Sequence, residues 1–131
     1  MKHLLITFAF LTAICTAAFA GERPTKAENE NAIAQGRIEL KAKIQEMDNS
    51  IKNNNIQAAE AASKEVYTIM RKGMAQTMAA ISLASADQQK AINARYSALE
   101  HEAHEYNKLS TNVSANGKKL LEYAKSYTKQ Y

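Results

Sequence analysis

The chain is poor in the residues that fix small folds by covalent chemistry. Its 131 residues include one cysteine, Cys15, which cannot form a disulfide within the chain. Cys15 also lies in an N-terminal segment that we expect to be removed during export. The remaining protein would then have no disulfide, no thiolate metal ligand, no covalently bound haem and no cysteine nucleophile.

The first 20 residues have the features of a secretory signal peptide. A cationic start precedes an apolar run over residues 4–14, and the sequence AFA at residues 18–20 fits an A-x-A cleavage site. The run is well short of the roughly 20 residues that a membrane-spanning helix needs. A lipid tether on Cys15 is disfavoured because Ile14 is too large for the position before a lipidated cysteine. We therefore expect cleavage after Ala20 and a periplasmic or secreted protein.

Helix-breaking residues are also scarce. The sequence has four glycines and one proline, Pro24, whereas the strong helix formers Ala, Glu, Lys and Gln are abundant. No stretch shows the alternation typical of a half-buried strand. We therefore predict a polar leader over residues 21–25 and a single all-α domain over residues 26–131. Its expected architecture is an antiparallel bundle of four helices.

Hydrophobic periodicity and capping residues place these helices. We expect helices over about 26–51, over 56–83, from an N-cap at Ser85 to a turn near 110–112, and from that turn to about 129. Asn55 is the expected N-cap of the second helix, and Ser85 with Gln88 forms a capping-box pattern at the third. Three long helices are the alternative, because the heptad phase of the third stripe continues beyond the turn.

The apolar stripes predict a thin core. All three phenylalanines lie in the first 20 residues, and tryptophan is absent. The predicted stripes are Ile33, Leu40, Ile44, Met47 and Ile51; then Ile56, Ala59, Ala62, Ser63, Val66, Met70, Gly73, Thr77, Ile81 and Ala84; then Ile92, Tyr96, Leu99, Ala103 and Tyr106. Gly73 is unfavourable in a helix by about 1 kcal/mol relative to Ala. We expect a neighbouring helix to pass close to its backbone.

The stretch LEHEAHEY, residues 99–106, is the strongest candidate for chemistry. With the apolar stripe of its helix turned inward, His101 and His104 face outward, and residues three or four apart can approach one ion. Imidazole and carboxylate groups suit Zn²⁺ or Cu²⁺, but one helix supplies only part of a coordination sphere. A second helix or molecule would have to complete it, and a solvated charged face is the interpretation that we favour. The candidate metal ligands are His101, His104, Glu105 and Glu100.

Methionine and tyrosine stripes are candidates for a protein interface. They consist of Met70, Met74 and Met78, and of Tyr123, Tyr127 and Tyr131. Thioethers can bind Cu(I), although we favour the methionines as gap-filling residues. Tyrosine beside lysine suits an interface, although the interpretation that we favour is that the rings close the end of the bundle. The candidate interface residues are Met74, Met78, Tyr123, Tyr127, Tyr131, Lys125 and Lys129.

The net charge and the absent motifs argue against several classes of function. The net charge of +4 is too small to indicate nucleic acid binding, although residues 108–131 hold five lysines against Glu122 and would allow a weak contact with an anionic surface. A P-loop, a G-x-S-x-G motif and a glycine-rich dinucleotide turn are absent, so we expect no enzyme. The favoured hypothesis is an exported bundle that acts by protein binding or self-association. A metal-binding or stress-sensing envelope protein is the alternative, and an enzyme of unrecognised type comes third.

Overall fold

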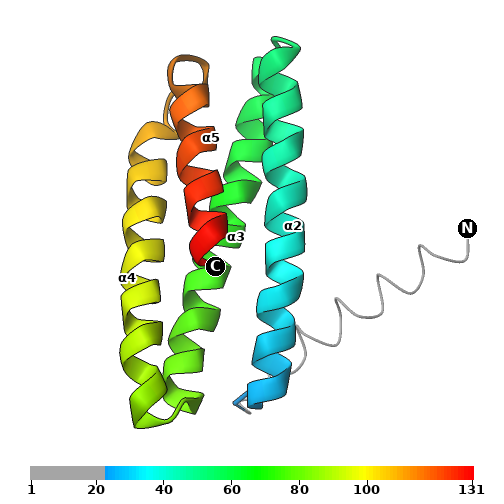
Figure 1. Ribbon diagram of the computed structural model, residues 1–131. Helices are drawn as coiled ribbons and strands as arrows, with labels where there is room; N and C mark the ends of the chain where they lie inside the picture. Colours follow the sequence, from blue (N-terminus) through cyan, green and yellow to red (C-terminus); the bar gives the residue numbers. More distant parts are fainter. Residues whose placement is uncertain (1–22) are drawn as a thin grey trace, which may run out of the picture.

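Four helices form an up-down-up-down bundle in the computed structural model, which describes residues 23–131 (Figure 1). They are α2 (Lys26–Lys52), α3 (Ile56–Leu83), α4 (Ala86–Leu109) and α5 (Val113–Gln130). The predicted all-α fold with four helices is confirmed, and the alternative of three long helices is wrong because α4 and α5 are separate. The predicted signal peptide and its cleavage site lie outside the described residues. None of the described helices is long and apolar enough to cross a membrane.

Side chains with oxygen acceptors begin three of the helices. Asn55 accepts a hydrogen bond from the amide of Ala58 at 3.1 Å, as predicted, and Asn112 accepts one from Ala115 at 3.0 Å. The predicted capping box at Ser85 is wrong, since the Ser85 side chain makes no capping hydrogen bond. A complete capping box instead begins α2, where Thr25 and Glu28 exchange hydrogen bonds.

The caps lead to a paired prediction on stability. We expect Asn112→Ala to lower the free energy of unfolding by about 1 kcal/mol, because an amide in the first turn of α5 loses its acceptor. Ser85→Ala is the matched control, and it should change the stability by less than about 0.5 kcal/mol. Urea unfolding followed by circular dichroism measures both values. Equal losses in the two variants would contradict this account of the caps.

The core contains most of the predicted stripes. Buried residues include Ile33, Leu40, Ile44 and Met47 on α2; Ala59, Ala62, Ser63, Val66, Met70, Gly73 and Thr77 on α3; and Leu99, Ala103 and Tyr106 on α4. The Tyr106 hydroxyl lies 2.8 Å from the hydroxyl oxygen of Ser63, so the largest buried ring has a polar partner inside the core. Small residues on α3 leave room for this ring and for α5.

Gly73 lies where a side chain of α5 packs against the backbone of α3, so the prediction of a close neighbouring helix is confirmed. A β-carbon built on Gly73 would lie 2.6 Å from the hydroxyl oxygen of Tyr127 and 2.8 Å from the ring of Tyr131. The Tyr127 hydroxyl donates a hydrogen bond of 2.6 Å to the carbonyl oxygen of Met70, and its ring is fully buried. α3 and α5 therefore form a close diagonal pair across the bundle.

The other diagonal of the bundle stays open. Within residues 23–131, α2 and α4 share no close backbone contact. α5 has 18 residues, whereas the other three helices have 24 to 28, so α5 ends about midway along them (Figure 1). Among the described helices, only α2, α3 and α4 continue beyond that point. Ile92 and Tyr96 on α4 are consequently half-buried, although their heptad positions predicted a place in the core.

Candidate binding groove

A groove of about 470 Å³ lies between α2 and α4, beyond the end of α5. Ile33 on α2, Leu83 and Ala84 at the end of α3, and Ile92 on α4 provide its apolar surface. Ile33, Ala84 and Ile92 belong to the heptad stripes that face the bundle axis, and Leu83 lies beside the stripe of α3. The groove is therefore an uncovered section of the core, in the place that α5 fills farther along the bundle.

Two arginines line this groove on opposite walls. Arg37 belongs to α2 and Arg95 to α4, and the Nε atom of each is buried without a hydrogen-bond partner. A terminal nitrogen of Arg37 donates to the carbonyl oxygen of Tyr131. Among the described residues, neither arginine forms a salt bridge with an Asp or Glu side chain. Arg95 therefore keeps its terminal nitrogens for an anionic partner, whereas Arg37 already uses one of its own on Tyr131.

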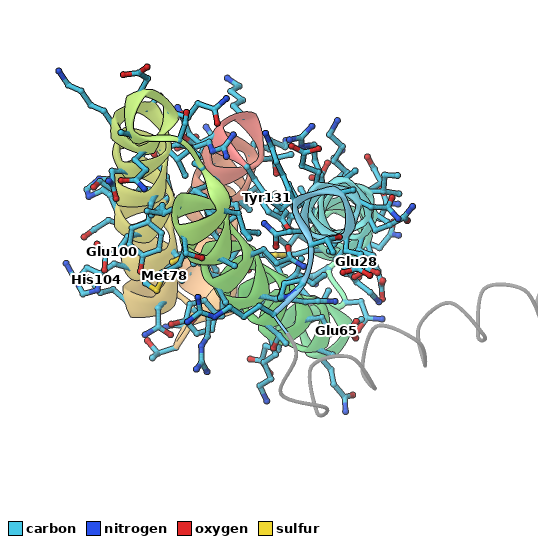
Figure 2. All side chains as sticks on the ribbon, turned by 90° about the horizontal axis from the view of Figure 1, so that it is seen from below. Glu28, Glu65, Met78, Glu100, His104 and Tyr131 are labelled. Atoms are coloured by element: carbon cyan, nitrogen blue, oxygen red, sulfur yellow. The ribbon has the colours of Figure 1, made fainter. Side chains whose placement is uncertain are left out.

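Tyr131 separates the groove from the core. Its ring is buried and its hydroxyl donates a hydrogen bond of 2.6 Å to the side chain of Gln76 on α3. Its backbone carbonyl contacts Arg37 on α2, and Figure 2 shows the residue among the helices when the bundle is seen from the groove end. Burial raises the pKa of the Tyr131 hydroxyl to about 12, so the phenol is neutral at physiological pH.

The predicted metal ligands lie on the outer face of α4. Figure 2 shows Glu100 and His104 extending away from the other helices, and His101 is also exposed. Glu105 accepts a hydrogen bond of 2.7 Å from Lys108, which lowers the pKa of its carboxyl group. In the described part of the chain, no group of three or more His, Cys, Asp and Glu residues is arranged to hold a metal ion. Zinc or copper binding stays a prediction.

Glu102, the remaining acidic residue of the stretch LEHEAHEY, lies toward α5. Ser126 donates a hydrogen bond of 2.8 Å to one carboxylate oxygen of Glu102, and the other oxygen is buried without a partner. Glu102 thus contributes to the packing of α4 against α5 and does not face the outward histidines. The stretch therefore divides between a solvated outer face and an inner face that belongs to the bundle.

The candidate interface residues fall into three environments. Tyr127 and Tyr131 are buried within the bundle, which corrects their assignment to a free interface. Their rings pack inside the bundle as the alternative proposed, but midway along it and not at its end. Tyr123 and Met74 pack partly against the core. The exposed members are Met78, Lys125 and Lys129. Met70 is fully buried and so is a core residue, as its gap-filling interpretation predicts.

Sequence reasoning missed the groove, although one signal for it was present. The expected last helix is shorter than the other three, so part of the bundle had to lack a fourth helix. The residues that line the groove come from α2, α3 and α4, and only the pairing of these helices brings them together. No single motif contains Arg37 and Arg95, which are 58 positions apart in the numbering.

The comparisons with known proteins assign no function to these residues. No family model, no curated protein and no solved structure matches the chain. The proposed function therefore rests on the geometry of the groove and on the chemistry of its walls.

Proposed function

We propose that this is an exported binding protein that receives a helix of another polypeptide along its open groove. The observation that carries the proposal is the groove itself, because no helix among the described residues covers the apolar side chains that α2, α3 and α4 contribute to it. A docked helix would complete the four-helix cross-section, and ridges-into-grooves packing at 8–10 Å between axes is the usual arrangement for such neighbours. The proposed export depends on the N-terminal segment, whose composition is that of a signal peptide.

The energetics of the groove support this class of function. Ile33, Leu83 and Ile92 line it, and burial of apolar surface contributes about 25 cal/mol per Å². Four alanines in the lining, Ala34, Ala80, Ala84 and Ala91, allow close approach of a helix backbone. A small core with few large side chains gains more from such a partner than a large domain would.

Site-specific photo-crosslinking tests the proposal. We expect a photoreactive amino acid at Ala91, an exposed residue that lines the groove, to cross-link one defined polypeptide in cells. Ala61 is the matched control, because it is an exposed helical alanine outside the groove. The purified partner should then bind with a negative heat-capacity change in calorimetry, as burial of apolar surface requires. Equal labelling at both positions, or none at Ala91, would contradict the proposal.

A further inference from the structure

We propose that the groove selects an acidic amphipathic helix from a different protein, with a carboxylate placed between Arg37 and Arg95. This inference rests on the proposed function and specifies the chemistry of the partner. The groove has an apolar floor from three helices and one guanidinium group on each long wall. Such a surface matches a helix that carries alanine or leucine on its inner face and glutamate or aspartate at its edges.

The charges of the groove are unequal. Lys26, Arg37 and Arg95 line it against one acid, Glu30. Lys26 and Glu30 lie 4.0 Å apart and therefore offset each other at the N-terminal end of α2. The two arginines have no such partner among the described side chains, and a buried Nε atom of each lacks a hydrogen bond. The positive charge is thus concentrated on the two guanidinium groups.

A carboxylate satisfies these groups better than a neutral side chain does. Guanidinium and carboxylate form paired, charge-assisted hydrogen bonds whose planar geometry suits both partners. The Nε atoms of both arginines are buried, so the terminal nitrogens are the donors that a docked helix can reach. An oxygen of Tyr131 occupies one terminal nitrogen of Arg37, and the other terminal nitrogens gain an acceptor when a carboxylate arrives with the partner.

The dimensions of the groove fit a short helix. The wall on α2 extends from Lys26 to Arg37, which is about 16 Å at 1.5 Å per residue, or three turns. α5 occupies the equivalent position in the other half of the bundle, so the site continues an existing line of helix packing. Pockets for small molecules usually enclose most of their ligand, whereas this groove lies between two helices, α2 and α4, that share no close backbone contact in the described residues.

The same charges disfavour a second copy of the chain in a symmetric pair. A two-fold interface places each patch against itself, so Arg37 and Arg95 would face the same cations of the partner. Like charges at such an interface oppose association. The geometry therefore points to a heterologous partner that supplies the missing negative charge.

Binding of designed peptides to the purified protein tests the inference. The probes are capped 14-residue peptides with leucine and alanine at the a and d positions of two heptads, carrying glutamate, glutamine or lysine at the flanking positions. We expect the glutamate peptide to bind at least about tenfold more tightly than the glutamine peptide, and the lysine peptide to bind most weakly. Fluorescence anisotropy gives the three dissociation constants.

Two arginine variants distinguish binding in the groove from general electrostatic attraction to the protein. Arg95→Gln should reduce the preference for glutamate to about threefold or less, and affinity for the glutamine peptide should stay unchanged. Arg71→Gln is the control, since Arg71 is an exposed arginine of α3 outside the groove and its loss should leave the preference intact. Arg95 is preferred to Arg37 for this test because Arg37 also holds Tyr131.

The outcomes distinguish this inference from the function on which it rests. Equal binding of the glutamate and glutamine peptides would overturn the acidic selectivity and leave helix binding in place. Failure of all three peptides would overturn both. Tighter binding of laurate, with displacement of the peptides, would assign the groove to a lipid and also overturn the inference. Dimerisation of the protein that abolishes peptide binding would identify a second copy as the occupant.

Discussion

Gly73→Ala should lower the free energy of unfolding by about 2–3 kcal/mol, although alanine is the better helix former. The new β-carbon would lie 2.6 Å from the hydroxyl oxygen of Tyr127 and 2.8 Å from two ring atoms of Tyr131. Both rings are buried, and the Tyr127 hydroxyl is bonded to Met70, so neither ring can move without losing contacts. Overpacking and the strained hydrogen bond outweigh a helix-propensity gain of about 1 kcal/mol. Chemical denaturation with circular dichroism measures the difference.

Gly117→Ala provides a matched control for this result. A β-carbon on Gly117 would lie 2.9 Å from Cδ1 of Ile51, which is the flexible end of a half-buried side chain. Because that end can rotate away, we expect the stability to change by less than about 0.5 kcal/mol. A similar loss in both variants would mean that α5 tolerates no added volume anywhere, and the special role of Gly73 would be wrong.

High pH should unfold the bundle between about pH 10 and pH 12. Burial raises the pKa of Tyr106 and Tyr131 from 10.0 to about 12, and burial raises the pKa of Tyr127 further. The folded state therefore holds protons that the unfolded chain releases, so stability is intact below about pH 10 and falls as the pH rises toward the folded-state pKa values. The shifts of Tyr106 and Tyr131 correspond to about 2–3 kcal/mol each, and Tyr127 adds to them, so the sum approaches the whole stability of a small domain. Circular dichroism and tyrosinate absorbance should change together.

Tyr131→Phe tests the cause of this alkaline transition. The variant removes one of the three protons, so the dependence of stability on pH between 10 and 12 should weaken by about one proton per molecule. The lost hydrogen bond to Gln76 also lowers stability at neutral pH and therefore shifts the midpoint of the alkaline transition. The informative quantity is the slope of the unfolding free energy against pH. An unchanged slope, or a bundle that stays folded at pH 12, would contradict the role of the buried phenols.

The helices were predictable because their signals are local. Apolar residues at intervals of three and four define the buried face of each helix, and the asparagines at 55 and 112 can cap only the helices that follow them. The capping box at Ser85 was predicted wrongly because a sequence pattern identifies a residue that can cap, and it does not show that the capping hydrogen bond forms. At an exposed position water competes for the same serine hydroxyl, so the pattern alone does not determine the bond.

The site was less predictable because it depends on how the helices are paired. The outward position of His101 and His104 follows from the register of α4 alone, and the structure agrees with it. Arg37 and Arg95 line the same groove only because α2 and α4 lie on opposite sides of the bundle. For Tyr127 and Tyr131 the sequence allowed both an interface and a place inside the bundle, and only the structure shows that the glycines of α2 and α3 admit their rings to the core.

The close α3–α5 diagonal makes the groove mechanically compliant. α2 and α4 each rest on this central pair, and no close backbone contact joins them to one another in the described residues. Small sideways movements of either helix can therefore widen or narrow the space between them without breaking a contact across it. If the proposed helix binds there, the size of its inner side chains would restrict binding less than its charge, and the two arginines would contribute most of the selectivity.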